Sequence, residues 1–298
     1  MAFRSGFVAI IGRPNVGKST LMNAALGERL AIVTPKAQTT RHRITGIYNG
    51  DSSQIVFLDT PGYHSSDKPL NKVMIEIVDS VIDDADLVCL MLDASMADHA
   101  VEHELFDRIG AERCILVANK ADLVDRSKLG GIAAGFRDAW KATELIFVSA
   151  LSNLGVDELI RAIIERLPEG EPFFPPDSYT SHPVRFLAAE IIRKQLFLKM
   201  HQEIPYSSAV EIDEFKDPRR EGDITRIRAS IVVERESQKG MVVGKGGALI
   251  KKIGTAARSE IEELVGGKVF LDLRVRVEKD WTKNPKAIKK LGYNTQLE

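Results

Sequence analysis

The amino-acid sequence predicts an α/β domain with a mostly parallel sheet, followed by a smaller α+β domain. Through residues 1–168, apolar runs typical of strands alternate with helix-like segments, which is the pattern of a parallel sheet with helices on both faces. Five of the chain's 12 prolines then fall between residues 168 and 183, and such a segment is typical of an extended, semi-rigid spacer. We therefore expect domains over residues 1–168 and 183–298, joined by a linker over 169–182.

Hydrophobic periodicity gives the elements of the first domain. Five apolar, β-rich runs are expected to form strands, and the segments between the later runs have helical spacing. Ligands of parallel sheets bind beyond the carboxyl ends of the strands, so polar residues at those ends are candidates for function. The expected strands cover residues 7–11, 54–58, 86–92, 113–118 and 144–148, and the expected helices cover 69–83, 98–110, 126–140 and 153–166.

The first strand end carries the pattern G-x-x-x-x-G-K-S of a P-loop, placed between an apolar run and a helix-like segment. The two glycines let backbone N–H groups converge on a polyphosphate, and the helix N-terminus adds partial positive charge. The Lys18 ammonium would reach the terminal phosphates, and the Ser19 hydroxyl would bind a phosphate-bound Mg²⁺. The nucleotide-binding residues expected here are Gly12, Arg13, Pro14, Asn15, Val16, Gly17, Lys18, Ser19 and Thr20.

Three further strand ends complete a guanine-nucleotide site. After the second run, Asp59 can hold Mg²⁺ and the amide of Gly62 can meet a γ-phosphate. After the fourth run, the Asp122 carboxylate can accept hydrogen bonds from N1–H and the exocyclic amine of guanine, which adenine does not offer. The same loop supplies Asn119, which can tie it to the P-loop, and Lys120, whose stem can lie along the base. After the last run, the expected contacts to guanine O6 are the backbone amides of Ser149, Ala150 and Leu151.

These motifs, in this order and spacing, resemble the translation-factor-like GTPases over about residues 1–168. The resemblance implies hydrolysis of GTP to GDP and a switch loop whose Thr binds Mg²⁺ when γ-phosphate is present, and we choose Thr40 over Thr39. Tyr63 stands where Ras-like enzymes place a water-orienting Gln, as in the hydrophobic-substituted GTPases. In several of those, an Asn at the position of Asn15 helps to hold a K⁺ that neutralises transition-state charge.

The resemblance therefore predicts slow intrinsic hydrolysis that K⁺ accelerates. Three arginines are also candidate fingers for this chemistry, and His64 is a candidate general base. For the arginines, Arg13, Arg41 and Arg43, a solvated or RNA-facing charge is the preferred interpretation, and an exposed loop His is usually without a catalytic role. The residues expected to act in hydrolysis are Asn15, Lys18, Thr40 and Gly62, and the expected Mg²⁺ ligands are Ser19, Thr40 and Asp59.

Composition and charge limit the class of protein. The 298 residues are 44% hydrophobic and 28% charged, and neither a membrane-spanning run nor a signal-peptide run is evident, so we expect a cytoplasmic protein. Cys89 and Cys114 lie inside apolar runs and are expected to be buried, without forming a disulfide or metal site. The net charge of −1 combines −7 over residues 1–182 with +6 over 183–298, which suggests that a polyanion meets the second half.

The second domain has a different order of elements: helix, strand, strand, helix, G-x-x-G, helix, strand. With apolar residues on both sides of the G-x-x-G loop, this order resembles a type II KH domain, and a plain helix–helix turn is the alternative. The resemblance implies single-stranded RNA binding, with phosphate contacts from lysines and splayed bases in an apolar groove. The expected elements cover residues 184–202, 207–215, 224–234, 248–265 and 269–277. The expected RNA-binding residues are Gly244, Lys245, Gly246, Gly247, Ile250 and Lys251.

A basic tail over residues 279–290 ends this domain. Its lysines could face RNA or a membrane surface, and Trp281 is expected to pack on the domain instead of stacking on a base.

A P-loop GTPase domain joined by a proline-rich linker to a type II KH domain is the architecture of the bacterial Era family, which the whole chain resembles. The resemblance implies a GTP-dependent factor in assembly of the small (30S) ribosomal subunit, which binds near the 3′ end of the small-subunit rRNA. It also implies peripheral association with the inner face of the cell membrane. We expect a monomer. A membrane-associated cell-cycle signalling GTPase and a plain RNA-binding module with a structural nucleotide are the alternatives.

Overall fold

The computed structural model describes residues 2–64, 66–218, 220 and 222–293, which form two compact units. The first unit comprises Met1–Ser65 and Met74–Ser181, and the second comprises Ser66–Val73 and His182–Glu298. The division at residue 181 lies at the end of the expected linker. Among the described residues, no helix combines the length and apolar character needed to cross a bilayer.

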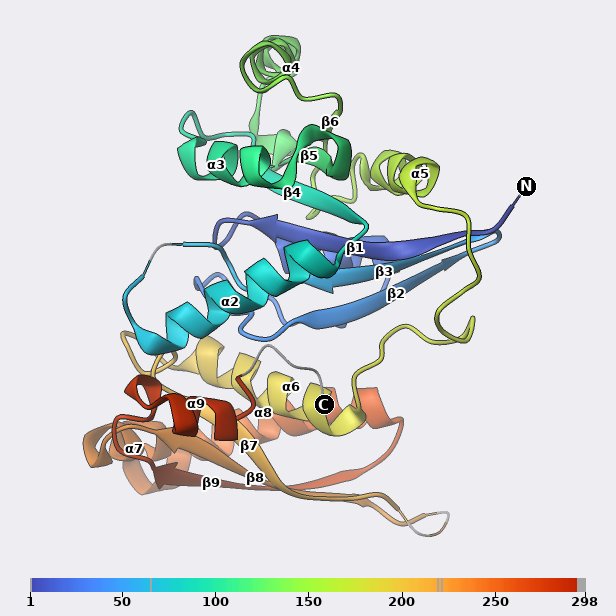
Figure 1. Cartoon of the computed structure of the whole chain (residues 1–298). Helices are drawn as coiled ribbons and strands as arrows, with labels where there is room; N and C mark the ends of the chain where they lie inside the picture. The colour runs from blue at the N-terminus through green and yellow to red at the C-terminus, as the bar shows by residue number, and fades with distance from the viewer. Residues whose placement is uncertain (1, 65, 219, 221, 294–298) are drawn as a thin grey trace. The chain divides into compact units, whose positions relative to one another are not determined.

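The first unit is a sheet between two layers of helices (Figure 1). Its strands are β1 (Arg4–Gly12), β2 (Ile44–Gly50), β3 (Ser53–Asp59), β4 (Leu87–Asp93), β5 (Cys114–Asn119) and β6 (Leu145–Phe147). Its helices are α1 (Lys18–Leu26), α2 (Pro69–Asp84), α3 (Ala100–Ile109), α4 (Arg126–Trp140) and α5 (Val156–Arg166), with short 3₁₀ helices η1 (Ala111–Arg113) and η2 (Ala121–Leu123). The first residues of α2, up to Val73, are grouped with the second unit. The five expected strands and four expected helices of this half are present, with bounds shifted by three residues at most.

The sheet order is β2-β3-β1-β4-β5-β6, and every neighbouring pair is parallel except β2 with β3. On one face α1 and α5 pack together, and α2 and α3 lie on the other. The mostly parallel α/β fold is confirmed. Because the parallel strands point the same way, the P-loop and the loops after β3, β4, β5 and β6 emerge at one edge.

The strand β2 was not expected from the sequence. It contains Gly46, where a Cβ would lie 2.7 Å from Cδ1 of Leu26 in α1. The helix therefore packs against bare backbone at this point, so β2 lacks the run of large apolar side chains by which the other strands were recognised.

The expected linker is hydrogen-bonded to the sheet of the first unit. The side chain of Gln54 in β3 is fully buried, and its Oε1 accepts from the N–H groups of Phe173 at 2.7 Å and Phe174 at 3.0 Å. Further along, the Ile47 N–H of β2 donates to the Tyr179 carbonyl at 2.9 Å, and the Thr180 hydroxyl donates to the Thr45 carbonyl at 2.7 Å. Residues 178–180 therefore lie along the free edge of β2, and residues 173 and 174 are held at β3, so the segment is fixed to the first unit.

The second unit has a three-stranded sheet in the order β7-β8-β9, with β7 antiparallel and β9 parallel to β8. Its strands are β7 (Ala209–Lys216), β8 (Thr225–Val233) and β9 (Val269–Val277), and its helices are α6 (Val184–Lys199), α7 (Glu236–Val243), α8 (Ala248–Val265) and α9 (Pro285–Lys290), with 3₁₀ helices η3 (Lys245–Gly247) and η4 (Trp281–Lys283). Its core includes Ile192, Leu196, Ala229, Ile231, Ile253, Ala257 and Ile261. The expected order of elements is confirmed.

Several polar and aromatic groups are buried for structural reasons. Cys89 and Cys114 are free thiols inside the sheet, and burial raises the pKa of both, as expected of unreactive core residues. Trp281 is fully buried, donates from Nε1 to the Ser207 carbonyl at 3.0 Å and stacks on Tyr293, so its expected packing role is confirmed.

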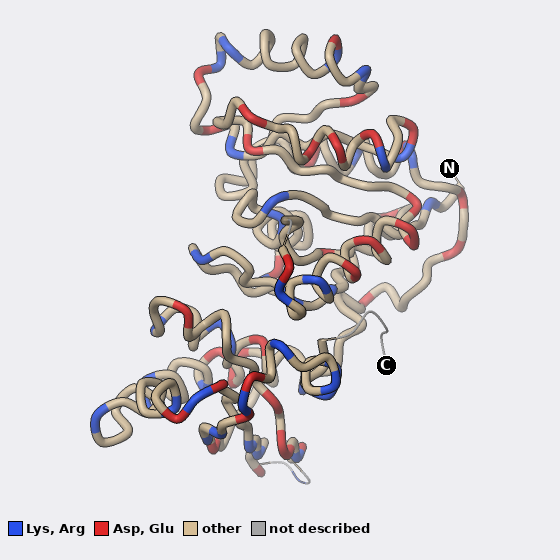
Figure 2. The backbone as a smooth tube through the Cα atoms, turned by 60° about the vertical axis from the view of Figure 1, so that its left-hand side comes forward, with Lys and Arg blue, Asp and Glu red and all other residues tan. Residues whose placement is uncertain are grey.

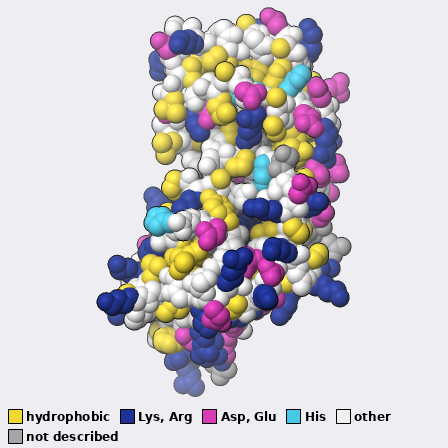
Figure 3. Space-filling view, turned by 90° about the vertical axis from the view of Figure 1, so that its left-hand side faces the viewer, with side chains coloured by type: hydrophobic (Ala, Val, Ile, Leu, Met, Phe, Trp, Pro, Cys, Tyr) yellow, Lys and Arg dark blue, Asp and Glu magenta, His cyan; other side chains and the backbone are white. Residues whose placement is uncertain are grey.

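Charge is distributed unevenly over the elements. Acidic residues recur along the helices of the first unit, as the red segments of Figure 2 show. One charged pair of the second half is internal, since the Arg193 side chain is only 1% exposed and pairs with Glu190 in the same helix. Lys and Arg side chains nonetheless gather on the surface of the second unit (Figure 3).

Candidate nucleotide and RNA sites

The P-loop surrounds a pocket of about 310 Å³. Its backbone requires glycine at position 17, where φ is +103° and a Cβ would collide with Nδ2 of Asn119. The Lys18 side chain folds back over the loop, and its Nζ donates to the carbonyls of Gly12 and Arg13, both at 3.0 Å. The expected P-loop residues that line the pocket are Pro14, Asn15, Gly17, Lys18, Ser19 and Thr20.

Lys18 and Asp59 are buried charges of opposite sign. Burial lowers the pKa of Lys18 to about 8, against the attraction of Asp59. Burial likewise raises the pKa of Asp59 to about 6, against Lys18 and the hydroxyls of Ser19 and Thr40. A phosphate anion beside Lys18 would favour its charged form, and a cation beside Asp59 would favour the carboxylate. The site is therefore suited electrostatically to an anionic phosphate and a metal ion together.

The three expected metal ligands meet although they come from separate segments. The Ser19 Oγ lies 2.8 Å from the Thr40 Oγ1 and donates to the Asp59 Oδ2 at 2.5 Å. The second oxygen of Asp59, Oδ1, is buried and has no hydrogen-bond partner among the described residues. Two hydroxyls and one carboxylate are hard oxygen donors, so these residues fit Mg²⁺. Thr39 points elsewhere, because its Oγ1 bonds to the Thr34 Oγ1 at 2.6 Å and the Lys36 carbonyl at 2.7 Å.

The loop after β3 packs directly on the P-loop. At Gly62 a Cβ would lie 2.7 Å from N, Cα and Cγ of Pro14, so a side chain there would push the two loops apart. The Tyr63 N–H donates to the Gly12 carbonyl at 3.0 Å. His64 connects the loop after β3 with the segment before β2, since its Nδ1 lies 2.8 Å from the Gly62 carbonyl and its Nε2 lies 2.8 Å from Nε2 of Gln38.

The arginines considered as fingers are held by the protein. Arg13 Nε lies 3.0 Å from Oε1 of Glu102 in α3, a carboxylate whose side chain is only 3% exposed. Arg43 pairs with Asp84 at 3.4 Å. Arg41 is 1% exposed, so the expectation of a solvated or RNA-facing charge is wrong for this residue. Its guanidinium is buried in the protein, so RNA cannot reach it.

Asn119 ties three loops together at the expected guanine site. Its Nδ2 donates to the Val16 carbonyl of the P-loop at 2.8 Å, and its Oδ1 accepts from the Ala150 N–H at 3.0 Å. The Asp122 carboxylate is exposed in η2. Of the amides expected to meet O6, that of Ser149 donates to the Leu154 carbonyl at 2.9 Å, and Leu151 is highly exposed. The structure brings together Asn119, Val16 and Ala150.

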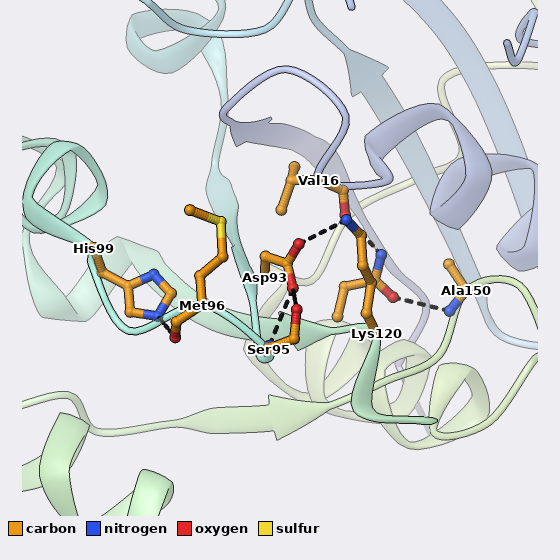
Figure 4. Close-up of polar contacts among 8 residues, drawn as sticks. Val16, Asp93, Ser95, Met96, His99, Lys120 and Ala150 are labelled. Atoms are coloured by element: carbon orange, nitrogen blue, oxygen red, sulfur yellow. Dashed lines mark hydrogen bonds and ion pairs between the residues drawn. The ribbon is translucent and has the colours of Figure 1, made fainter. Parts of the chain in front are cut away.

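Asp93 is a residue of this site that the sequence reasoning missed. It ends β4 and accepts a hydrogen bond from Nζ of Lys120 at 2.6 Å, as Figure 4 shows. A usable signal was present in the sequence, because Asp93 follows an apolar strand at its carboxyl end, as Asp59 and Asn119 do.

The expected RNA loop lies between α7 and α8. The backbone of Gly244, Gly246 and Gly247 has positive φ values of 71°, 59° and 78°. Lys245 and Lys251 are exposed, and Ile250 is half-buried on the first turn of α8. An open glycine backbone beside two exposed lysines and a partly apolar helix turn is suited to a nucleic-acid backbone.

The chain matches two family models, "50S ribosome-binding GTPase" over residues 7–120 and "KH domain" over residues 203–282. It is 47% identical to GTPase Era of Geobacter metallireducens over 293 residues, which are 98% of each chain. It is 46% identical to GTPase Era of Syntrophus aciditrophicus, over 98% of this chain and 96% of that one.

Solved structures agree with these matches. One is a Tyr→Ala variant of Aquifex aeolicus Era bound to GDP and AlF₄⁻, which is 38% identical with a TM-score of 0.92 over 98% of this chain and 100% of that one. Another, with the same identity and TM-score over 98% and 99% of the two chains, is Era in complex with MgGDPNP and nucleotides 1506–1542 of 16S rRNA. With this sequence identity over nearly its whole length, the chain belongs to the Era family of GTPases.

Proposed function

We propose that this protein is a GTP-hydrolysing switch that binds small-subunit rRNA near its 3′ end and acts in maturation of the 30S subunit. The main support for nucleotide binding is that the side chains of Ser19, Thr40 and Asp59 lie in contact beside the buried Lys18. The RNA-binding part is supported by the exposed Lys245 and Lys251 at the G-x-x-G loop and by the rRNA bound to a relative that covers 98% of this chain.

The residues of the nucleotide site have separate roles in this proposal. The P-loop amides and Lys18 bind the phosphates, and Ser19, Thr40 and Asp59 would hold Mg²⁺. When bound, this ion would neutralise charge on the β- and γ-phosphates. Thr40 and Gly62 belong to loops whose arrangement depends on γ-phosphate, so its loss would release them.

We assign the selection of guanine to Asp122. A variant that replaces its hydrogen-bond acceptor with a donor tests this assignment. In Asp122→Asn the amide can present a donor where the carboxylate only accepts, which suits xanthine better than guanine. We expect affinity for GDP to fall by about 100-fold or more while affinity for XDP rises. Asp125→Asn, which changes an exposed carboxylate that caps α4, is the matched control. Unchanged selectivity in Asp122→Asn would refute the assignment.

Asn15 is the proposed K⁺ ligand. It lines the phosphate pocket and has a left-handed backbone, with φ of +61°. Hydrolysis by the wild type should be faster in K⁺ than in Na⁺ at equal ionic strength, and Asn15→Ala should remove that difference. Equal rates of the wild type in the two salts would refute the role.

The lysines of η4 and α9 support a second proposal, peripheral binding to anionic membranes. We also propose that the protein is a monomer. Lys283, Lys286, Lys289 and Lys290 are all exposed. Flotation with anionic vesicles in the absence of RNA should be lost when the four are changed to Glu. If wild-type protein does not float, the membrane contact is refuted and the rRNA proposal is unaffected.

A further inference from the structure

Asp93 is fixed by its own loop before it contacts the guanine-recognition segment. Its Oδ1 accepts from the Ser95 N–H at 3.1 Å and from the Ser95 Oγ at 2.6 Å. Its Oδ2 accepts from Nζ of Lys120 at 2.6 Å (Figure 4). The carboxylate side chain is 12% exposed. Both oxygens are thus engaged, and the Lys120 contact rests on a group that cannot turn away without losing the Ser95 bonds.

The backbone on each side of this contact is also fixed. Asp93 stands opposite Asn119 in the β4–β5 register, and the Ala94 N–H donates to the Asn119 carbonyl at 2.8 Å. Lys120 itself has a left-handed backbone, with φ of +62°, and the next N–H, of Ala121, donates to the Val148 carbonyl at 3.0 Å. The long Lys120 side chain is therefore anchored at both ends, which removes rotamer freedom that nucleotide binding would otherwise have to restrict.

We propose that Asp93 is a positioning residue for guanine-nucleotide binding, which holds the Lys120 ammonium so that the aliphatic stem stays oriented for the base. The inference rests on the proposed function, since it takes the segment around Asn119 as the guanine site. It deepens that function by adding a residue from the loop after β4 to a site otherwise formed by the P-loop, the loop after β5 and the loop after β6.

The ion pair also determines what Lys120 can contribute. Its positive charge is already matched by a carboxylate at hydrogen-bond distance, and the Lys120 hydrogen bond lowers the pKa of Asp93 against the effect of burial, so the carboxylate is ionised at neutral pH. Lys120 then acts through its apolar stem and leaves the phosphate charge to Lys18. Loosening Lys120 should weaken GMP, GDP and a GTP analogue by the same factor, since all three carry the same base.

The test is a double-mutant cycle on nucleotide affinity in the full-length protein. Asp93→Asn removes the charge and keeps the shape, and Lys120→Met removes the ammonium and keeps the stem. Each should weaken binding of all three nucleotides by about tenfold, the size of one charge-assisted hydrogen bond. Because Asp93 acts through Lys120, the double variant should bind as the Lys120→Met single variant does.

Two further variants keep the test decisive. Asp79→Asn is the matched control, because Asp79 also accepts from a cationic side chain, Arg108, at 2.6 Å but lies in α2. Its nucleotide affinity should equal that of the wild type. Ser95→Ala leaves the Asp93 charge and removes one of its restraints, so it should weaken binding by about two- to threefold, and it can replace Asp93→Asn if that variant does not fold.

The possible results distinguish a failure of the proposed role of Asp93 from a failure of the proposed function. Wild-type protein that fails to prefer guanine over adenine nucleotides would refute the proposed function. Wild-type selectivity with unchanged affinity in Asp93→Asn, or in Ser95→Ala if it stands in, would overturn the inference alone. Additive losses in the double variant would also overturn it, since they would show that Asp93 acts by a route other than Lys120.

Discussion

The Ser19 Oγ and the Thr40 Oγ1 lie 2.8 Å apart, although 21 positions separate these residues in the chain. One comes from the P-loop and the other from the segment before β2, and the buried Asp59 carboxylate joins them. Their meeting distinguishes Thr40 from its neighbour Thr39, which is bonded within its own loop.

Substitution of the two threonines tests this distinction. Thr40→Ala should weaken a GTP analogue by about tenfold in the presence of Mg²⁺ and leave GDP nearly unchanged, because the hydroxyl is needed with γ-phosphate and metal. Thr39→Ala is the matched control and should affect both nucleotides alike. Titration calorimetry with and without EDTA measures each affinity. The reverse pattern, with selective loss in Thr39→Ala, would reassign the switch ligand.

Arg13 and Glu102 should be coupled in stability. Arg13→Met leaves the Glu102 carboxylate buried without its ion-pair partner, and this should lower the free energy of unfolding of the first unit by about 3 kcal/mol. Adding Glu102→Leu removes the unpaired charge and should restore most of the loss. Urea unfolding without nucleotide measures both. A single variant as stable as the wild type would show that the pair contributes nothing.

Gln54 should determine how firmly the linker is attached. Gln54→Ala removes hydrogen bonds to the Phe173 and Phe174 backbone, so limited proteolysis near these residues should become several-fold faster. Asp51→Ala, a change at an exposed position in the turn between β2 and β3, is the control. Equal cleavage rates in Gln54→Ala and wild type would mean that these bonds do not restrain the linker.

The sequence was sufficient to predict those features that local patterns encode. The strand ends at Gly12, Asp59 and Asn119 were found because apolar runs stop there and polar motifs begin. The order of elements in the second unit followed in the same way, with α8 and β9 at the expected bounds.

Features that depend on distant partners were not predictable in this way. Gln54 gives no local sign that its amide binds a segment about 120 positions away. Arg41 resembles any surface arginine until the fold buries it, and β2 is recognisable only once α1 packs on Gly46. Asp93 is an intermediate case. Its position at the end of a strand could be predicted from the sequence, but its contact with Lys120 could not.

The central claim is that nucleotide state and rRNA binding are linked, and fluorescence anisotropy tests it most directly. A short single-stranded RNA matching the 3′ end of small-subunit rRNA is titrated at fixed salt with protein loaded with a GTP analogue, then with GDP. A scrambled RNA and the variant Lys245→Ala with Lys251→Ala are the controls. We expect tighter, sequence-selective binding in the GTP-analogue state, lost in the variant. Equal affinity in both states, for either RNA, would contradict the claim.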